Sequence, residues 1–323
     1  MTVTFYFARH GETLFNVRSL VQGWCDAPLT SAGIYDAYKL GQGLAKVNFV
    51  GACVSDAGRA QDTLSIALEA RENERVRLQS GLPIPSDQVK ADALDELFGW
   101  GIADEEDRTL AIEEFLRSRG CLRPHSLVAD SDRTPPADER WLALSEGWEP
   151  AMDELEWVDY PAYALATHRF GPRLAAPLPV RTDTRLREWC FGDLEGEPAL
   201  RMRNRLFDLF GDDLPRQDQN RRLDEIADYL AKRDSTRRAE NFAAIAGRIG
   251  SFLEDCGRSV ERRGGGNVLV VSHALLIRSV VFLYARDRVG DSPKIKNGSV
   301  TEVVWNDGVI AVGPIGVAPS ELF

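Results

Sequence analysis

Two histidines and two arginines occupy the positions at which parallel α/β sheets usually bind their ligands, directly after predicted strands. Arg9 and His10 end the first predicted strand of the chain, and His273 ends a late one. Arg59 opens a predicted helix behind a third strand, so the positive end of that helix faces the same edge. A neutral imidazole can attack phosphorus, and a guanidinium group holds phosphate oxygens through paired N–H donors. These four side chains therefore predict a positive crevice suited to a phosphoryl dianion.

The elements that must position these residues alternate between strands and helices along the chain. Short apolar runs predict strands at 3–8, 52–55 and 267–272. Apolar spacing and capping residues predict helices at 31–46, 60–70, 199–210, 223–232, 239–260 and 274–285. The runs 300–305 and 309–312 flank Asn306-Asp307-Gly308, which is a hairpin signal. We therefore expect an α/β fold of three layers, α/β/α, with a mostly parallel central sheet.

The charge of the chain limits the kinds of partner. Its 323 residues carry a formal net charge of −11, and the pI is about 5.0. An acidic surface disfavours nucleic acid and anionic membranes as partners, so an anion must bind in a locally basic pocket. We expect a small phosphorylated substrate as the partner. The oligomeric state stays open, with a homodimer as one option.

Neither a secretory signal nor a membrane span is predicted. The N-terminus, MTVTFYFARHGET, lacks a basic stretch followed by an apolar run and a small-residue cleavage site. No run approaches the about 18 apolar residues that a membrane helix needs. The cysteines are odd in number, lack metal-ligand spacing and are expected to be buried free thiols: Cys25, Cys53, Cys121, Cys190 and Cys256. We expect a cytoplasmic protein.

Four motifs, in order, resemble the signature of the histidine phosphatase (phosphoglycerate mutase-like) superfamily. They are Arg9-His10-Gly11-Glu12-Thr13 with Asn16 and the run Gln22 to Thr30; Ser55-Asp56 through Arg59 to Thr63; LREWCFGDLEG at 186–196; and Ser272-His273 through Arg278, with Asn297-Gly298-Ser299 beyond. The resemblance covers roughly residues 1–70 and 181–312. Each motif alone is weak, but four in the family's order identify the chain as similar to this superfamily.

The resemblance implies a role for each matching residue. His10 would be the nucleophile and become phosphohistidine, and Glu188 would protonate the leaving oxygen. Arg9, Arg59 and His273 would grip the phosphoryl oxygens, so that neither a metal nor another cofactor is required. The residues expected to line the phosphate pocket are Thr13, Asn16, Gln22, Gly23 and Ala274.

Two features depart from the pattern of the superfamily. Ala274 follows His273 where the family usually has glycine. Glu188 lies 129 positions after Arg59, a longer gap than is usual. Within that gap, residues 93–101 partly repeat the acidic motif, so Glu96 is a rival proton donor. We favour Glu188 because the run LREWCFGDLEGEP around it is the fuller match.

The long gap predicts an insertion. We expect a core made of residues 1–74 and 181–323, and an insertion or cap region at 75–180, in which a helix begins at Asp104 and runs to Phe115. A cap in this place would cover the crevice and select the substrate. A solvated decoration or an oligomer contact is the alternative. His125 and His168 lie in this region and are expected to be ordinary surface or packing residues.

Three functions remain open at this point. The first is a metal-independent phosphomonoesterase of the histidine acid phosphatase type, which hydrolyses a small phosphorylated metabolite through phospho-His10. The second is a phosphoglycerate mutase-type phosphotransferase, and the third is a non-catalytic phosphate-ligand-binding protein on the same fold. The runs LREWCFG and SHALLIR favour the phosphatase. The sequence does not name the substrate.

Overall fold

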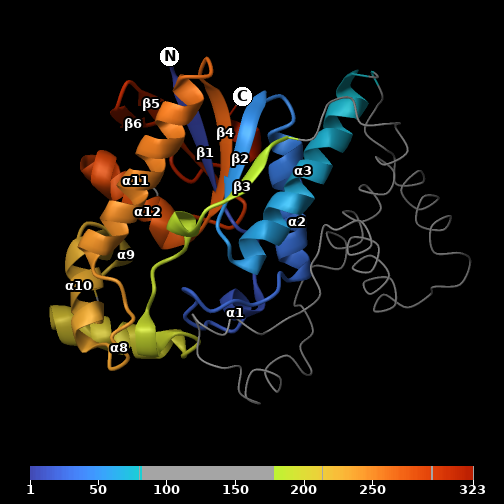
Figure 1. Ribbon diagram of the computed structural model, residues 1–323. Coiled ribbons are helices and arrows are strands. Elements are labelled where there is room, and N and C mark those ends of the chain that lie inside the picture. Colours follow the sequence, from blue (N-terminus) through green and yellow to red (C-terminus); the bar gives the residue numbers. More distant parts are fainter. Residues whose placement is uncertain (80, 82–177, 213, 292–293, 323) are drawn as a thin grey trace, which may run out of the picture.

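The structure is a computed structural model, and it describes residues 1–79, 81, 178–212, 214–291 and 294–322. Within these residues, a six-stranded sheet lies between two layers of helices (Figure 1). The three-layer α/β/α architecture expected from the sequence is confirmed. Most of the insertion region, including Glu96, the helix expected at 104–115, Cys121, His125 and His168, lies outside the described residues.

The sheet is mostly parallel. Its order is β3-β2-β4-β1-β5-β6. The strands are β1 (Val3–Arg9), β2 (Phe49–Val54), β3 (Val180–Thr182), β4 (Gly266–Ser272), β5 (Val300–Asn306) and β6 (Val309–Val312). Strands β3, β2, β4 and β1 are mutually parallel, and β5 pairs antiparallel with both β1 and β6. The β5–β6 pair is the hairpin that the Asn306-Asp307-Gly308 turn predicts.

Strand periodicity divides the core into two layers. In β1, Phe5 and Phe7 face one side and Tyr6 and Ala8 face the other, as the two-residue repeat of a strand requires. The helices on the first side are α10 (Leu223–Arg233), α11 (Phe242–Glu261) and α12 (Ala274–Tyr284). Those on the second side are α2 (Ser31–Gly43) and α3 (Gly58–Gln79). Both faces of the sheet are therefore buried.

The remaining described elements are three α-helices and four 3-10 turns. They are α1 (Leu14–Val17), α8 (Ala199–Phe210), α9 (Arg216–Asn220) and 3-10 turns at Thr184–Leu186, Gly192–Leu194, Arg286–Arg288 and Pro319–Glu321. The expected helix at 199–210 is found with the same bounds, whereas α3 runs nine residues beyond the expected end at Ala70. Neither β3 nor α9 is predicted by the sequence. Among the described helices, none has the length and apolar character of a membrane span.

Strand register determines the positions of the two histidines predicted from the sequence. Arg9 at the end of β1 lies opposite Ser272 at the end of β4, and the His10 N–H donates to the Ser272 carbonyl at 3.0 Å. His10 and His273 therefore leave the sheet side by side, at the carboxyl ends of β1 and β4. Gly11 follows directly, and a Cβ there would approach the Gly33 carbonyl oxygen at 2.1 Å. Only glycine permits α2 to pack this closely behind the histidine.

Candidate active site

His10 is a neutral imidazole with one nitrogen available for attack. Its Nδ1 lies 2.7 Å from the Gly11 carbonyl oxygen, and because a carbonyl can only accept, Nδ1 carries the hydrogen. Nε2 then holds a lone pair. Burial, followed by the positive charges of Arg59 and Arg9, lowers the pKa of His10 well below its ordinary value of 6.5. The imidazole is therefore unprotonated at Nε2 at neutral pH, as a nucleophile must be.

His273 is also neutral, and both of its nitrogens are engaged. Its ring centroid lies 5.2 Å from that of His10. Arg59 Nη2 approaches its Nδ1 at 3.0 Å, and since a guanidinium can only donate, Nδ1 accepts. The hydrogen sits on Nε2 and is donated to Ser55 Oγ at 2.8 Å. In this arrangement His273 orients Arg59, and its expected grip on phosphoryl oxygens stays a prediction.

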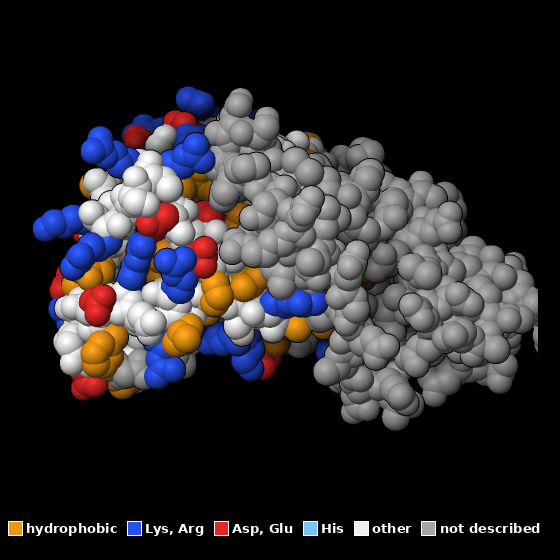
Figure 2. Space-filling model, turned by 90° about the horizontal axis from the view of Figure 1, so that it is seen from below, with side chains coloured by type: hydrophobic (Ala, Val, Ile, Leu, Met, Phe, Trp, Pro, Cys, Tyr) orange, Lys and Arg blue, Asp and Glu red, His pale blue; other side chains and the backbone are white. Residues whose placement is uncertain are grey.

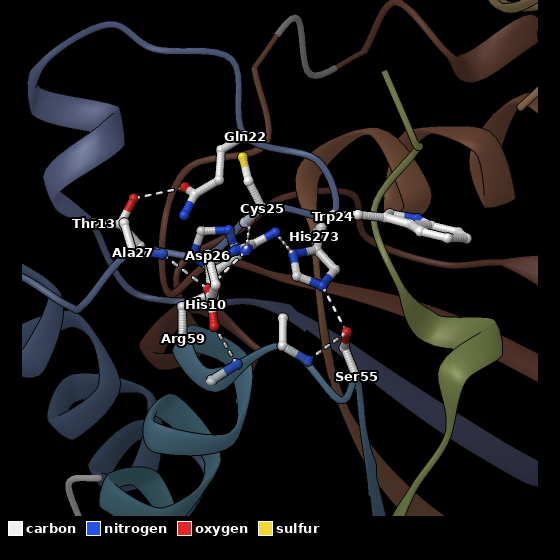
Figure 3. A network of polar contacts seen from close by, with 12 residues as sticks. His10, Thr13, Gln22, Trp24, Cys25, Asp26, Ala27, Ser55, Arg59 and His273 are labelled. Atoms are coloured by element: carbon white, nitrogen blue, oxygen red, sulfur yellow. Dashed lines mark hydrogen bonds and ion pairs between the residues drawn. The ribbon is translucent and has the colours of Figure 1, made fainter. Parts of the chain in front are cut away.

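Arg59 is the centre of the hydrogen-bond network (Figure 3). Its Nη1 donates to the Cys25 carbonyl and to Asp26 Oδ1, both at 2.8 Å, and its Nη2 donates to the Gly23 carbonyl at 2.8 Å. The residue is 1% exposed. Among the described residues, Asp26 is the one ion-pair partner of Arg59, and because its side chain is 21% exposed, the site retains positive character. The α3 residue is thus fixed against the loop that carries Gln22.

Three buried donors around His10 lack a hydrogen-bond partner in the described structure: Arg9 Nε, Arg59 Nε and Gln22 Nε2. The amide of Gln22 is oriented by Thr13, whose hydroxyl donates to Gln22 Oε1 at 2.7 Å (Figure 3). Burial lowers the pKa of Arg9 only to about 10, so it stays charged at neutral pH. Each unmet buried donor costs about 1–3 kcal/mol. A phosphoryl group, with several acceptor oxygens, can satisfy all three donors.

Asn16 belongs to the framework around His10. Its side chain accepts from the Thr13 backbone N–H at 3.2 Å and from Asn297 Nδ2 at 3.3 Å. The same Asn297 nitrogen donates to the His10 carbonyl at 2.9 Å. Asn297 is a positioning residue to which sequence reasoning assigned no role, although it stands in the last motif. It fixes the backbone of His10.

Glu188 lies at the N-terminus of α12, the helix that starts with Ala274. Its Oε1 accepts from the backbone N–H groups of Trp189 (3.1 Å) and Leu276 (2.9 Å), and Oε2 accepts from Leu275 N–H at 3.0 Å. Burial raises the pKa of Glu188 although these donors oppose the rise. Oε2 accepts one of these hydrogen bonds and Oε1 accepts two, so Oε2 is the oxygen better able to carry a proton.

Glu195 holds the two functional loops together, and sequence reasoning gave it no role. Its buried carboxylate accepts backbone N–H groups at 2.9–3.1 Å from Gly23, Trp24, Cys25 and Phe191. Gly23 therefore uses its N–H for Glu195 and its carbonyl for Arg59, and so forms the wall of the site. A Cβ on Gly23 would approach the Trp189 carbonyl oxygen at 2.2 Å, which explains the glycine.

Arg248 of α11 secures the segment that carries Glu188. It donates to the backbone carbonyls of Arg185, Arg187 and Glu188 at 2.6–3.0 Å, and it pairs with Glu240. No sequence motif signals this residue, because its partners are backbone oxygens some 60 positions away.

The structure thus joins residues of all four motifs in one hydrogen-bond network. The family model for the histidine phosphatase superfamily (branch 1) matches residues 5–83 and 165–313. The chain belongs to this family. The unmatched stretch between the two ranges falls within the predicted insertion.

Individual relatives are similar over short stretches. A 2,3-bisphosphoglycerate-dependent phosphoglycerate mutase 2 of Gloeobacter violaceus is 38% identical over 81 residues, which are 25% of this chain and 34% of the relative. A probable phosphoglycerate mutase GpmB of Yersinia pestis is 40% identical over 65 residues, 20% of this chain and 30% of the relative. The chain therefore spans about a third of the length of these curated relatives.

Solved structures share the fold of the described residues. A phosphoglycerate mutase from Bacillus anthracis str. Sterne aligns with a TM-score of 0.63 and 22% identity, covering 99% of this chain and 95% of that one. Bacillus stearothermophilus YhfR aligns with a TM-score of 0.51 and 21% identity, covering 98% and 97%. At this identity the likeness supports the fold alone.

Proposed function

We propose that this member of the histidine phosphatase superfamily is a phosphomonoesterase that acts on a small phosphorylated metabolite through a phosphohistidine at His10. One observation carries the proposal: a neutral His10 with a free Nε2 stands among three buried, unpaired donors from Arg9, Arg59 and Gln22. The donors fit the oxygens of a phosphoryl group, and Nε2 fits an attack on its phosphorus.

The reaction would have two steps. His10 Nε2 attacks phosphorus in line, and the bond from phosphorus to the ester oxygen breaks while Glu188 gives that oxygen its proton. Water then attacks phosphorus, and Glu188, now a carboxylate, takes one of its protons. The P–N bond breaks, which releases phosphate and restores neutral His10. Arg9 and Arg59 neutralise the charge that spreads over the equatorial oxygens.

A mutase is the second candidate, because the curated relatives matched over part of this chain are named as phosphoglycerate mutases. The first step is shared, and only the acceptor of the phosphoryl group differs. The motif runs LREWCFG and SHALLIR, which resemble the phosphatase branch, favour water as the acceptor.

Hydrolysis of p-nitrophenyl phosphate in the presence of EDTA tests the proposal, with wild type compared to His10→Ala. We expect wild-type turnover and a loss on the order of 10⁴-fold or more in the variant, as for other catalytic nucleophiles. Circular dichroism of both proteins controls for folding. No wild-type turnover, together with dependence on a bisphosphate primer, would favour the mutase; phosphate binding without turnover or phosphoenzyme would favour a binding protein.

A further inference from the structure

Arg187, the residue before Glu188, makes a two-pronged ion pair with Asp56. Its Nε donates to Asp56 Oδ1 at 2.7 Å, and its Nη2 donates to Oδ2. The two side chains are only 13% and 21% exposed. A paired fork of this kind fixes direction as well as distance, and limited exposure protects it from the screening that weakens surface ion pairs.

Trp24 completes the contact. The Arg187 guanidinium carbon lies 4.7 Å from the centroid of the Trp24 ring, and Trp24 Nε1 donates to the Glu188 carbonyl at 3.0 Å. The peptide of Glu188 is therefore held on both sides, by its own carbonyl and by the side chain that precedes it. We call Arg187, Asp56 and Trp24 the acid clamp.

The anchors of the acid clamp belong to the segments that hold the phosphate-binding arginine. Asp56 stands next to Ser55, which accepts from His273, and shortly before Arg59. Trp24 stands between Gly23 and Cys25, whose carbonyls accept from Arg59. The clamp thus connects the acid segment directly to the framework of Arg59 and His273, across more than 130 positions of sequence.

We propose that Arg187 is a positioning residue that, through Asp56 and Trp24, sets the place of the Glu188 carboxyl relative to His10. The inference rests on the proposed function in that Glu188 is taken as the proton donor. Removing the clamp should leave the fold intact, because Glu195 and Arg248 hold the same segment independently. Misplacement of a catalytic group by about 1 Å can cost on the order of 10²-fold in rate.

The kinetic test compares Arg187→Gln, Asp56→Asn and the double variant with wild type on an alkyl phosphate and on p-nitrophenyl phosphate. Arg185→Gln is the matched control, since Arg185 also forms a forked ion pair, with Asp183, and its other side-chain hydrogen bonds go to Ser251 and Asp255 rather than to Asp56. We expect Arg187→Gln to lower kcat on the alkyl phosphate by about tenfold or more and on p-nitrophenyl phosphate by less than about threefold. Phosphate inhibition should be unchanged.

Two further readouts separate positioning from general stabilisation. Arg187→Lys, which keeps the charge but not the fork, should recover part of the lost rate. The double variant should be no worse than the more impaired single variant, because the two side chains act through each other.

Equal losses on both substrates, weaker phosphate inhibition, or the same defect in Arg185→Gln would overturn the acid clamp. Hydrogen exchange of the backbone amides at 186–190 tests the acid clamp independently of enzyme activity. We expect faster exchange in Arg187→Gln than in Arg185→Gln, and equal exchange would also overturn the acid clamp. If wild type does not hydrolyse either ester, the proposed function fails, and the exchange data still decide whether the clamp exists.

Discussion

The two halves of the site are held in different ways. Arg9, His10 and His273 directly end or follow strands β1 and β4, so the hydrogen-bond ladder of the sheet places them. Glu188 lies in the segment 183–198, which contains only two 3-10 turns. That segment is held by side chains that bind backbone groups, chiefly Glu195 and Arg248.

Because of this difference, substitutions on the two sides of the site should affect activity and stability in different ways. After the roles proposed for His10 and Glu188, we call Arg9, His10 and His273 the nucleophile side and the segment 183–198 the acid side. A sheet ladder distributes position over many backbone hydrogen bonds, so single side-chain changes on the nucleophile side should alter chemistry more than geometry. The acid side depends on a few buried carboxylates. Asp234, for example, accepts backbone N–H groups from Asp193, Thr236, Arg238 and Ala239. Loss of one such carboxylate leaves several donors unpaired, which alters geometry and stability together.

Among the variants that test this difference between the two sides of the site, Arg59→Lys should show the largest loss of activity. Lysine cannot reproduce the fork that reaches Gly23, Cys25 and His273, so phosphate loses a fixed donor. We expect kcat/KM to fall on the order of 10²–10³-fold for every phosphate ester, whatever its leaving group. Steady-state kinetics on several esters measures this. A loss confined to poor leaving groups would contradict the assignment of Arg59 to the phosphoryl group.

Glu188→Gln should show the opposite pattern. Glutamine supplies no acidic proton, so alkyl phosphates should lose about 10²-fold in kcat. p-Nitrophenyl phosphate should lose far less, because its leaving group needs little protonation. A plot of log kcat against leaving-group pKa should steepen in the variant. If Glu96→Gln steepens the plot and Glu188→Gln does not, the proton donor is assigned to the wrong residue.

Glu195→Gln should weaken the acid side without removing a reacting group. One oxygen becomes an amide that faces backbone N–H groups, which costs about 1–3 kcal/mol in the free energy of unfolding. Urea denaturation measures this loss, and kcat should fall less than in Glu188→Gln. Glu197→Gln, at a neighbouring carboxylate paired with Arg201, is the control and should be near neutral. Equal destabilisation in both variants would argue against a special role for Glu195.

The pH dependence of stability should reveal the neutral histidines. Burial and the charge of Arg59 lower the pKa values of His10 and His273 in the folded state. The unfolded chain takes up their protons below the ordinary value of 6.5, whereas the folded chain does not. Stability should therefore fall as pH drops below 6.5, by up to about 1.4 kcal/mol per pH unit for each histidine. Urea denaturation at several pH values gives the free energy of unfolding as a function of pH. Its slope below pH 6.5 should be smaller in His10→Asn than in wild type, and an unchanged slope would mean that His10 is not held neutral.

The nucleophile side could be predicted from sequence because its signals are local. Apolar runs mark the strands, and His10 and His273 follow them at once, so the parallel register brings both to one edge. The pairing of Arg59 with His273 then follows from the helix that begins behind β2. These elements need only short-range periodicity and the general topology of parallel sheets.

On the acid side, the sequence reveals the motif around Glu188 but not the contacts that hold it in place. The partners of Glu195 and Arg248 are backbone groups many positions away, and nothing in the residue types indicates which N–H or carbonyl they meet. β3 is three exposed residues long and has no periodic signal. The bidentate contact of Arg187 with Asp56 likewise joins two surface-like residues that become neighbours only after the chain has folded.

Trapping the phosphoenzyme tests the central claim most directly. Wild-type protein is mixed with a phosphate ester, quenched in base within the first turnover and digested, and the peptides are analysed by mass spectrometry. We predict an acid-labile, base-stable phosphoryl adduct on His10, absent from His10→Ala. Hydrolysis that proceeds without any such adduct, or an adduct on His273 instead, would contradict the assignment of His10 as the nucleophile.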